Sequence, residues 1–122
     1  MSRVQDKVAV VTGAGSGIGR ALAVVLARRG ARVAISDVNE EGLSQTSERV
    51  NALGGEAHTA LLDVSDRDAV SAYASAVVEH FGVVHQIYNN AGIAGGAVPV
   101  TECDYETYEK IIAINLWGVI NG

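Results

Sequence analysis

Short apolar runs alternate along the chain with longer segments whose apolar residues recur at helical spacing. The first run, Val8 to Val11, is typical of a strand buried on both faces of a parallel sheet, and we expect this strand over residues 7–12. Similar runs predict strands at residues 33–35, 57–62 and 84–88. Because a helical pattern follows each strand, the chain is predicted to be α/β, with βαβ units and helices on both faces of the sheet.

Helical periodicity covers residues 18–29, 40–53 and 65–81, and a last segment that starts at residue 104. Ser65 is expected to cap the third helix and Gly82 to end it, while Gly30 is expected to cap the first at its C-terminus. The residues expected to face the core are Ile18, Ala21, Leu22, Val25 and Leu26 in the first helix, and Leu43, Val50 and Leu53 in the second.

Four glycines lie within residues 13–19, between the first strand and the first helix. Glycines let the backbone turn tightly and approach a pyrophosphate, and a helix that begins there directs free N–H groups at the anion. The alternative is a flexible glycine-rich turn, but the strand before it and the helix after it favour a nucleotide phosphate site. If the phosphate turn follows the first strand, the sheet order is expected to be 3-2-1-4.

Polar residues follow the second, third and fourth strands, at the edge where such sheets bind ligands. Asp37 is placed to accept the ribose hydroxyls of an adenosine, although a solvated aspartate at a strand end is the alternative. Its carboxylate would repel a 2′-phosphate, and no basic residue lies between Gly13 and Gly19, so NAD is the expected cofactor. Asp63 ends the third strand at the same edge, where a residue that shapes the turn before Ser65 is an equally good interpretation.

The pattern T-G-x-x-x-G-x-G, formed by Thr12, Gly13, Gly17 and Gly19, resembles the short-chain dehydrogenase/reductase family. The sequence N-N-A-G at residues 89–92 is similar to a second fingerprint of that family. The resemblance implies a Rossmann-type, doubly wound sheet, of which this chain has about four strands. It also implies hydride transfer between a nicotinamide cofactor and a small-molecule alcohol or carbonyl substrate.

The resemblance also implies roles for individual residues. Asp63 and Val64 would hold the adenine ring, and Asn115 would be the catalytic asparagine that holds a water in a proton relay. The alternative for Asn115 is a buried helix-packing residue bonded to a backbone group. The implied cofactor-binding residues are Gly13, Ser16, Gly17, Ile18, Gly19, Asp37, Asp63, Val64, Asn90, Ala91 and Gly92.

The family's Tyr-x-x-x-Lys pair has no counterpart in the 122 residues, whose only lysines are Lys7 and Lys110. A tyrosine needs a nearby ammonium to bring its pKa from ~10 toward neutrality. We therefore expect residues 1–122 to be the N-terminal cofactor-binding part of a single domain, truncated within the helix that carries Asn115 and inactive alone. The alternative is a non-catalytic nucleotide-binding or regulatory module.

Charge and composition narrow the possible partners. The net charge of −5 argues against nucleic acid and anionic membranes as partners. A single cysteine, Cys103, and the absence of a visible signal peptide or long apolar run favour a cytoplasmic protein. The three histidines lack the spacing of metal ligands. The family resemblance implies a homo-oligomer, a dimer or tetramer, formed through the helix that carries Asn115.

Overall fold

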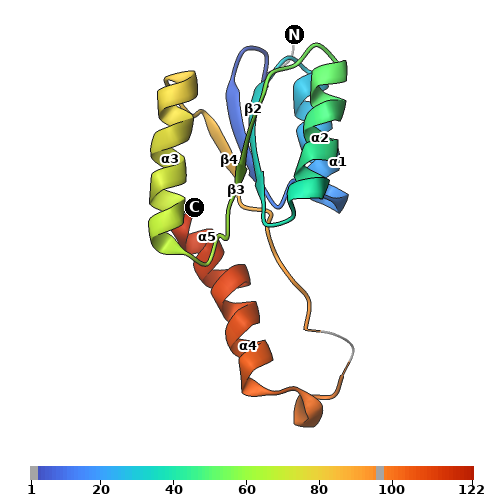
Figure 1. The fold of residues 1–122 in the computed structure, drawn as a ribbon, viewed down its shortest axis with the longest axis vertical. Helices are drawn as coiled ribbons and strands as arrows, with labels where there is room; N and C mark the ends of the chain where they lie inside the picture. The colour runs from blue at the N-terminus through green and yellow to red at the C-terminus, as the bar shows by residue number, and fades with distance from the viewer. Residues whose placement is uncertain (1–2, 96–97) are drawn as a thin grey trace.

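The computed structural model describes residues 3–95 and 98–122, which form a parallel sheet between layers of helices (Figure 1). The strand order is β3-β2-β1-β4, so the expected order 3-2-1-4 is confirmed. The register places Val11 of the first strand opposite Ile35 of the second and Tyr88 of the fourth. The strands are β1 (Val8–Thr12), β2 (Arg32–Asp37), β3 (Ala57–Leu61) and β4 (Gln86–Tyr88).

Two helices cover one face of the sheet and a third covers the other (Figure 1). The first face packs against α1 (Gly17–Arg28) and α2 (Glu40–Ala52), and the second against α3 (Arg67–Phe81). Every residue of β1 is buried, as its unbroken apolar run predicts. Alternate β1 residues therefore serve two cores, with Ala9 and Val11 on one side and Val8 and Val10 on the other.

The face of α1 that packs on the sheet differs from the prediction. Two of its large apolar residues lie outside the core. The side chains of Ile18 and Val25 are 79% and 39% exposed, and Leu53 of the second helical segment is 44% exposed. The buried positions of α1 are Gly19, Ala23, Leu26 and Ala27. Mostly small residues at the contact let the helix approach the sheet closely, which leaves the bulkier Ile18 outside the core.

The cap of the third helix also differs from the prediction. Asp66, not Ser65, is the N-cap, and its Oδ1 accepts a hydrogen bond of 3.0 Å from the backbone N–H of Ala69. Gly82 ends the helix in the left-handed conformation, with φ of +84°. Arg29, rather than Gly30, is the C-cap of α1, with Gly30 next at φ of +89°.

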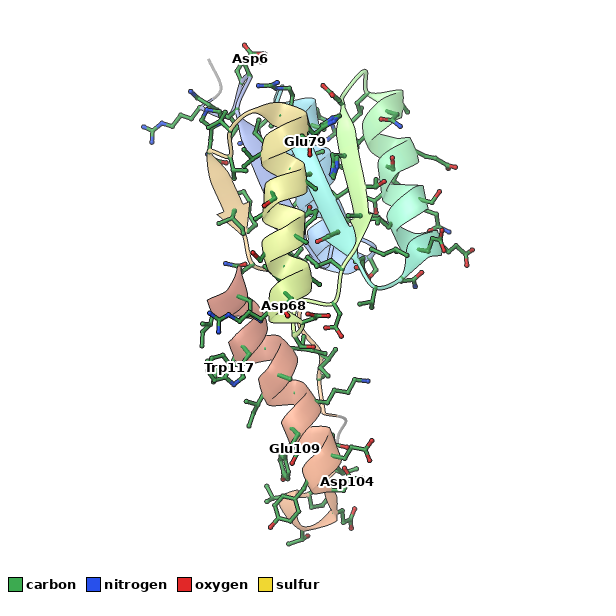
Figure 2. The ribbon with its side chains drawn as sticks, turned by 60° about the vertical axis from the view of Figure 1, so that its left-hand side comes forward. Asp6, Asp68, Glu79, Asp104, Glu109 and Trp117 are labelled. Atoms are coloured by element: carbon green, nitrogen blue, oxygen red, sulfur yellow. The ribbon has the colours of Figure 1, made fainter. Side chains whose placement is uncertain are left out.

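The last helical segment extends away from the sheet (Figures 1 and 2). Asp104 is the N-cap of this segment and not its first helical residue, because Asp104 Oδ1 accepts a 2.8 Å hydrogen bond from the Thr107 N–H. The segment consists of α4 (Tyr105–Ile112), a π turn (Ala113–Trp117) and α5 (Gly118–Asn121). Its end returns to the body of the domain, where Asn121 Nδ2 donates a 3.0 Å hydrogen bond to the Val64 carbonyl.

The histidines contribute to packing. His80 Nε2 lies 3.0 Å from Glu56 Oε1, and the His58 ring centroid lies 5.0 Å from that of His80. Burial, followed by the charge of His80, lowers the pKa of His58. His85 accepts a 2.9 Å hydrogen bond at Nδ1 from the N–H of Val8. Within residues 3–95 and 98–122, no three potential ligands gather to hold a metal, and no helix is long and apolar enough to cross a membrane.

Candidate functional site

A cleft of about 350 Å³ lies at the carboxyl edge of the sheet, beside the start of α1. The structure brings together there all eleven residues predicted to bind the cofactor. Those residues are Gly13, Ser16, Gly17, Ile18, Gly19, Asp37, Asp63, Val64, Asn90, Ala91 and Gly92. The sequence reasoning missed four apolar neighbours, which are Val38, Leu62, Ile93 and Ile114. Each of the four is adjacent in sequence to a predicted site residue, Ile114 to Asn115 and the others to cofactor-binding residues, and that adjacency was the available signal.

The glycine-rich turn needs glycine for two different reasons. Gly13 and Gly17 have φ of +65° and +53°, which L-residues with a side chain rarely adopt. At Gly19, an added Cβ would lie only 2.6 Å from Asn90 Nδ2 and would also collide with the Gly13 carbonyl. The first turn of α1 carries no acidic residue, so its positive end is left for an anion. The turn therefore fits a pyrophosphate group.

Asp37 connects the end of β2 to the glycine-rich turn. Its Oδ2 accepts a 2.8 Å hydrogen bond from the N–H of Gly15, and its Oδ1 accepts one of 3.0 Å from the N–H of Asn39. Since a carboxylate offers about four lone-pair sites, these two bonds leave acceptor capacity that faces the cleft. The position and capacity of this carboxylate suit a pair of ribose hydroxyls.

Thr12 and Asn90 join the ends of β1 and β4. The Thr12 hydroxyl accepts 3.1 Å hydrogen bonds from the backbone N–H groups of Asn90 and Ala91. In return, Asn90 Nδ2 donates to the carbonyls of Thr12 and Gly13, at 3.0 and 3.3 Å. These four bonds hold the loop after β4 against the glycine-rich turn, so that both line one cleft.

The carboxylate of Asp63 organises the turn before α3. Its Oδ1 accepts hydrogen bonds from the backbone N–H and the hydroxyl of Ser65, at 2.9 and 2.6 Å. This geometry is that of the turn residue that the sequence left as an alternative. Asp63 and Val64 also line the cleft, and a contact between this pair and an adenine ring stays a prediction.

Asn115 lies in the π turn and is exposed, so the expectation that it is buried is wrong. Its Oδ1 accepts from the N–H of Ile93 and its Nδ2 donates to the carbonyl of Ile93, both at 2.8 Å. The amide is thus bonded to a backbone group, as the packing alternative expects. Because Ile93 lines the cleft, Asn115 positions one of its walls, and a role in proton relay stays a prediction.

A larger cavity of about 1020 Å³ lies between α3, the sheet and α5. Apolar side chains dominate its lining, among them Val77, Ile87, Trp117 and Ile120. Neither the glycine-rich turn nor Asp37 contributes to it. The polar and backbone groups suited to a nucleotide therefore lie in the smaller cleft.

Comparison with known proteins agrees with this geometry. The family model described as short chain dehydrogenase matches residues 7–122. The chain belongs to the short-chain dehydrogenase family. One relative of this chain is SadH of Mycobacterium tuberculosis (strain ATCC 25618 / H37Rv), whose name gives it as an oxidoreductase and which is 52% identical over 122 residues, covering 100% of this chain and 44% of SadH. The chain thus spans less than half the length of that relative.

Solved dehydrogenase structures have the same fold. NAD⁺-bound xylitol dehydrogenase superposes with a TM-score of 0.94 at 34% identity, covering 98% of this chain and 46% of the other. A metagenomic short-chain oxidoreductase in complex with NADP superposes with a TM-score of 0.91 at 35% identity, covering 98% of this chain and 54% of the other. Both nicotinamide cofactors therefore occur among the structural relatives.

The two glycines nearest the start of α1 are predicted to tolerate substitution differently. Gly17→Asn should preserve the fold, because asparagine tolerates positive φ and no atom lies within 4 Å of an added Cβ. Gly19→Ala should destabilise the protein by about 1–3 kcal/mol, because the new methyl forces the turn and Asn90 apart. Urea denaturation of both variants measures the difference, and equal losses of stability would contradict this account.

Proposed function

We propose that the protein is an NAD-dependent oxidoreductase that transfers a hydride between the cofactor and a small-molecule alcohol or carbonyl substrate. The observation that carries the proposal is the hydrogen bond from the Gly15 N–H to Asp37 Oδ2, at 2.8 Å. This bond brings the Asp37 carboxylate directly beside the glycine-rich turn, which supports binding of a ribose next to a phosphate group. Family membership and the oxidoreductase name of SadH support this chemistry.

Each part of the cleft suits one part of a dinucleotide. The backbone N–H groups at the start of α1 suit the pyrophosphate, and the carboxylate of Asp37 suits the adenosine ribose. Ala91 and Gly92 have little or no side chain, so they leave room for the second ribose. When bound, the cofactor supplies or accepts the hydride, while this chain binds and orients it.

The charges at the cleft favour NAD over NADP. In this proposal the 2′-phosphate of NADP would meet the carboxylate of Asp37, and the residue that follows it is the apolar Val38. Proteins that accept the phosphate commonly place an arginine nearby. Among the residues that the structure describes, no arginine or lysine lines this cleft. A carboxylate without a compensating cation penalises the doubly charged phosphate.

The first prediction from this proposal concerns cofactor preference. We expect the protein to bind NAD more tightly than NADP, and Asp37→Ala to weaken NAD binding by about 1–3 kcal/mol because the ribose hydroxyls lose their acceptor. Asp37→Asn should reduce the difference between the affinities for NAD and NADP, because a neutral amide does not repel the 2′-phosphate. Isothermal titration calorimetry measures each affinity, with the exposed Asp68→Asn on α3 as control. Tighter NADP binding by the unsubstituted protein would contradict the prediction.

The second prediction concerns turnover by the 122 residues themselves. None of their tyrosines has a lysine four positions later, so the chain has no pair equipped to act as general acid and base at neutral pH. Loss of such a group typically costs ~10²–10⁴ in rate. We expect no change in NADH absorbance with any member of a panel of secondary alcohols and ketones. Turnover by the purified 122-residue chain would refute this assignment.

A longer protein that contains this chain and a Tyr-x-x-x-Lys pair should convert an alcohol or ketone of the same panel. If it binds NAD but converts none of them, the regulatory-module alternative is favoured.

We further propose that the protein is a homo-oligomer that buries the exposed face of its last helical segment. Ile112, Leu116, Trp117 and Ile120 are 50–58% exposed there, and Trp117 and Ile120 also line the larger cavity beside α3. Several large apolar side chains exposed on one segment favour association. We expect Leu116→Glu to shift the protein toward monomer in light scattering, whereas Val25→Glu on α1 should not. A monomeric unsubstituted protein at micromolar concentration would overturn the proposal.

A further inference from the structure

The glycine-rich turn is held from the side that faces α2 by a partly buried polar network of Arg20 and Thr46. Arg20 Nη2 donates to the carbonyl of Gly15 at 2.5 Å and to that of Gly42 at 3.2 Å. Arg20 Nε donates to the hydroxyl of Thr46 at 3.0 Å, and this hydroxyl donates to the carbonyl of Ala14 at 2.7 Å. Thr46 is fully buried. Two consecutive carbonyls of the turn are therefore fixed from one side.

The close approach of α2 depends on Gly42. A Cβ added at Gly42 would lie 2.5 Å from the Gly15 oxygen. Any side chain at this position would push the helix away from the turn, so glycine is what brings Thr46 and the Gly42 carbonyl within reach. The network thus belongs to the packing of α1 against α2 and not to a mobile surface.

A carbonyl that is fixed on the α2 side also fixes the direction of the N–H in the same peptide. The peptide bonds of the turn are trans, and in a trans peptide the carbonyl and the N–H point in opposite directions. The Ala14–Gly15 peptide illustrates this, since its carbonyl is bonded to Thr46 while its N–H donates to Asp37 on the other side. By the same geometry, the Gly15 carbonyl that Arg20 holds turns the N–H of Ser16 away from α2.

That N–H is available for a ligand. Ser16 lines the cleft, and no hydrogen bond to its N–H is found within the part of the chain that the structure describes. Its φ of −162° is extended, as expected for the residue that precedes a helix. A pyrophosphate oxygen beside the start of α1 would satisfy this donor.

We propose that Arg20, together with Thr46, is a positioning residue that aims the Ser16 N–H at the cofactor pyrophosphate. Arg20 does not line the cleft, so it acts through the Gly15–Ser16 peptide without contact to the ligand. The inference rests on the proposed function, because it requires a dinucleotide in this cleft. It adds a determinant of affinity that lies on the far side of the turn from the ligand.

A ligand series separates positioning from general stability. We expect Arg20→Met to weaken NAD and ADP binding about tenfold, because charge-assisted hydrogen bonds orient the donor peptide. Adenosine, which has no phosphate, should bind Arg20→Met as it binds the unsubstituted protein. Arg28→Met removes an exposed arginine two turns further along α1 and serves as control. Equal weakening of adenosine would show that Arg20 only stabilises the fold, and would overturn the proposal.

Two further measurements separate positioning from simple charge attraction. Thr46→Val keeps the arginine charge but removes the hydroxyl that Arg20 Nε contacts, so it should weaken binding of NAD and ADP, while Thr46→Ser should restore binding. The loss in Arg20→Met should persist in high salt, where through-space attraction is screened. Full rescue by Arg20→Lys with a loss that vanishes in salt would overturn the positioning role. Failure of the unsubstituted protein to bind NAD or NADP would overturn the proposed function, and this inference with it.

Discussion

The hydroxyl of Thr12 is the point on which the cleft depends. It lies at the end of β1, the strand buried along its whole length, and it accepts the N–H groups of Asn90 and Ala91. Parallel strands that end at one edge bring two loops together there, but they do not set the distance between them. The hydroxyl supplies that restraint. A strand whose only role was core packing would have no use for a polar residue, 4% exposed, at its last position.

The glycine-rich turn is held in place by hydrogen bonds to the protein's own groups. The peptides between Gly13 and Gly15 donate to the Ser36 carbonyl and to Asp37, and their carbonyls accept from Asn90 and Thr46. Glycine-rich backbone is costly to order, because glycine loses more conformational freedom than other residues. Here the hydrogen bonds formed on folding offset that loss of conformational entropy. Ligand binding therefore does not have to order the turn. Pre-ordering of this kind raises affinity without a new contact to the ligand.

Those parts of the fold and the cleft that follow from strong local signals were predictable from the sequence. The run of residues 8–11 specified a central strand. The glycine spacing and Asp37, together with the residues that the family resemblance implied, indicated what lines the cleft. Three features did not follow from local sequence patterns. Ser65 and Asp66 are both good caps, and the side chain of Asp63 bonds Ser65 and leaves the cap to Asp66. The exposure of Ile18 depends on how closely α1 approaches the sheet, which no local pattern encodes. The bond between Asn115 and Ile93 joins residues 22 apart in sequence.

The π turn at Ala113–Trp117 sets the angular phase of the last helix. A π turn holds one residue more than an α turn, so everything after it is rotated about the helix axis by roughly 100° relative to an uninterrupted helix. Within the π turn, Asn115 accepts a hydrogen bond from the backbone N–H of Ile93. After the turn, Asn121 donates one to the carbonyl of Val64. Ile93 and Val64 line the same cleft from different loops. The last helical segment therefore contacts two loops that line the cleft, and the extra residue in its π turn sets which of its side chains reach the second loop.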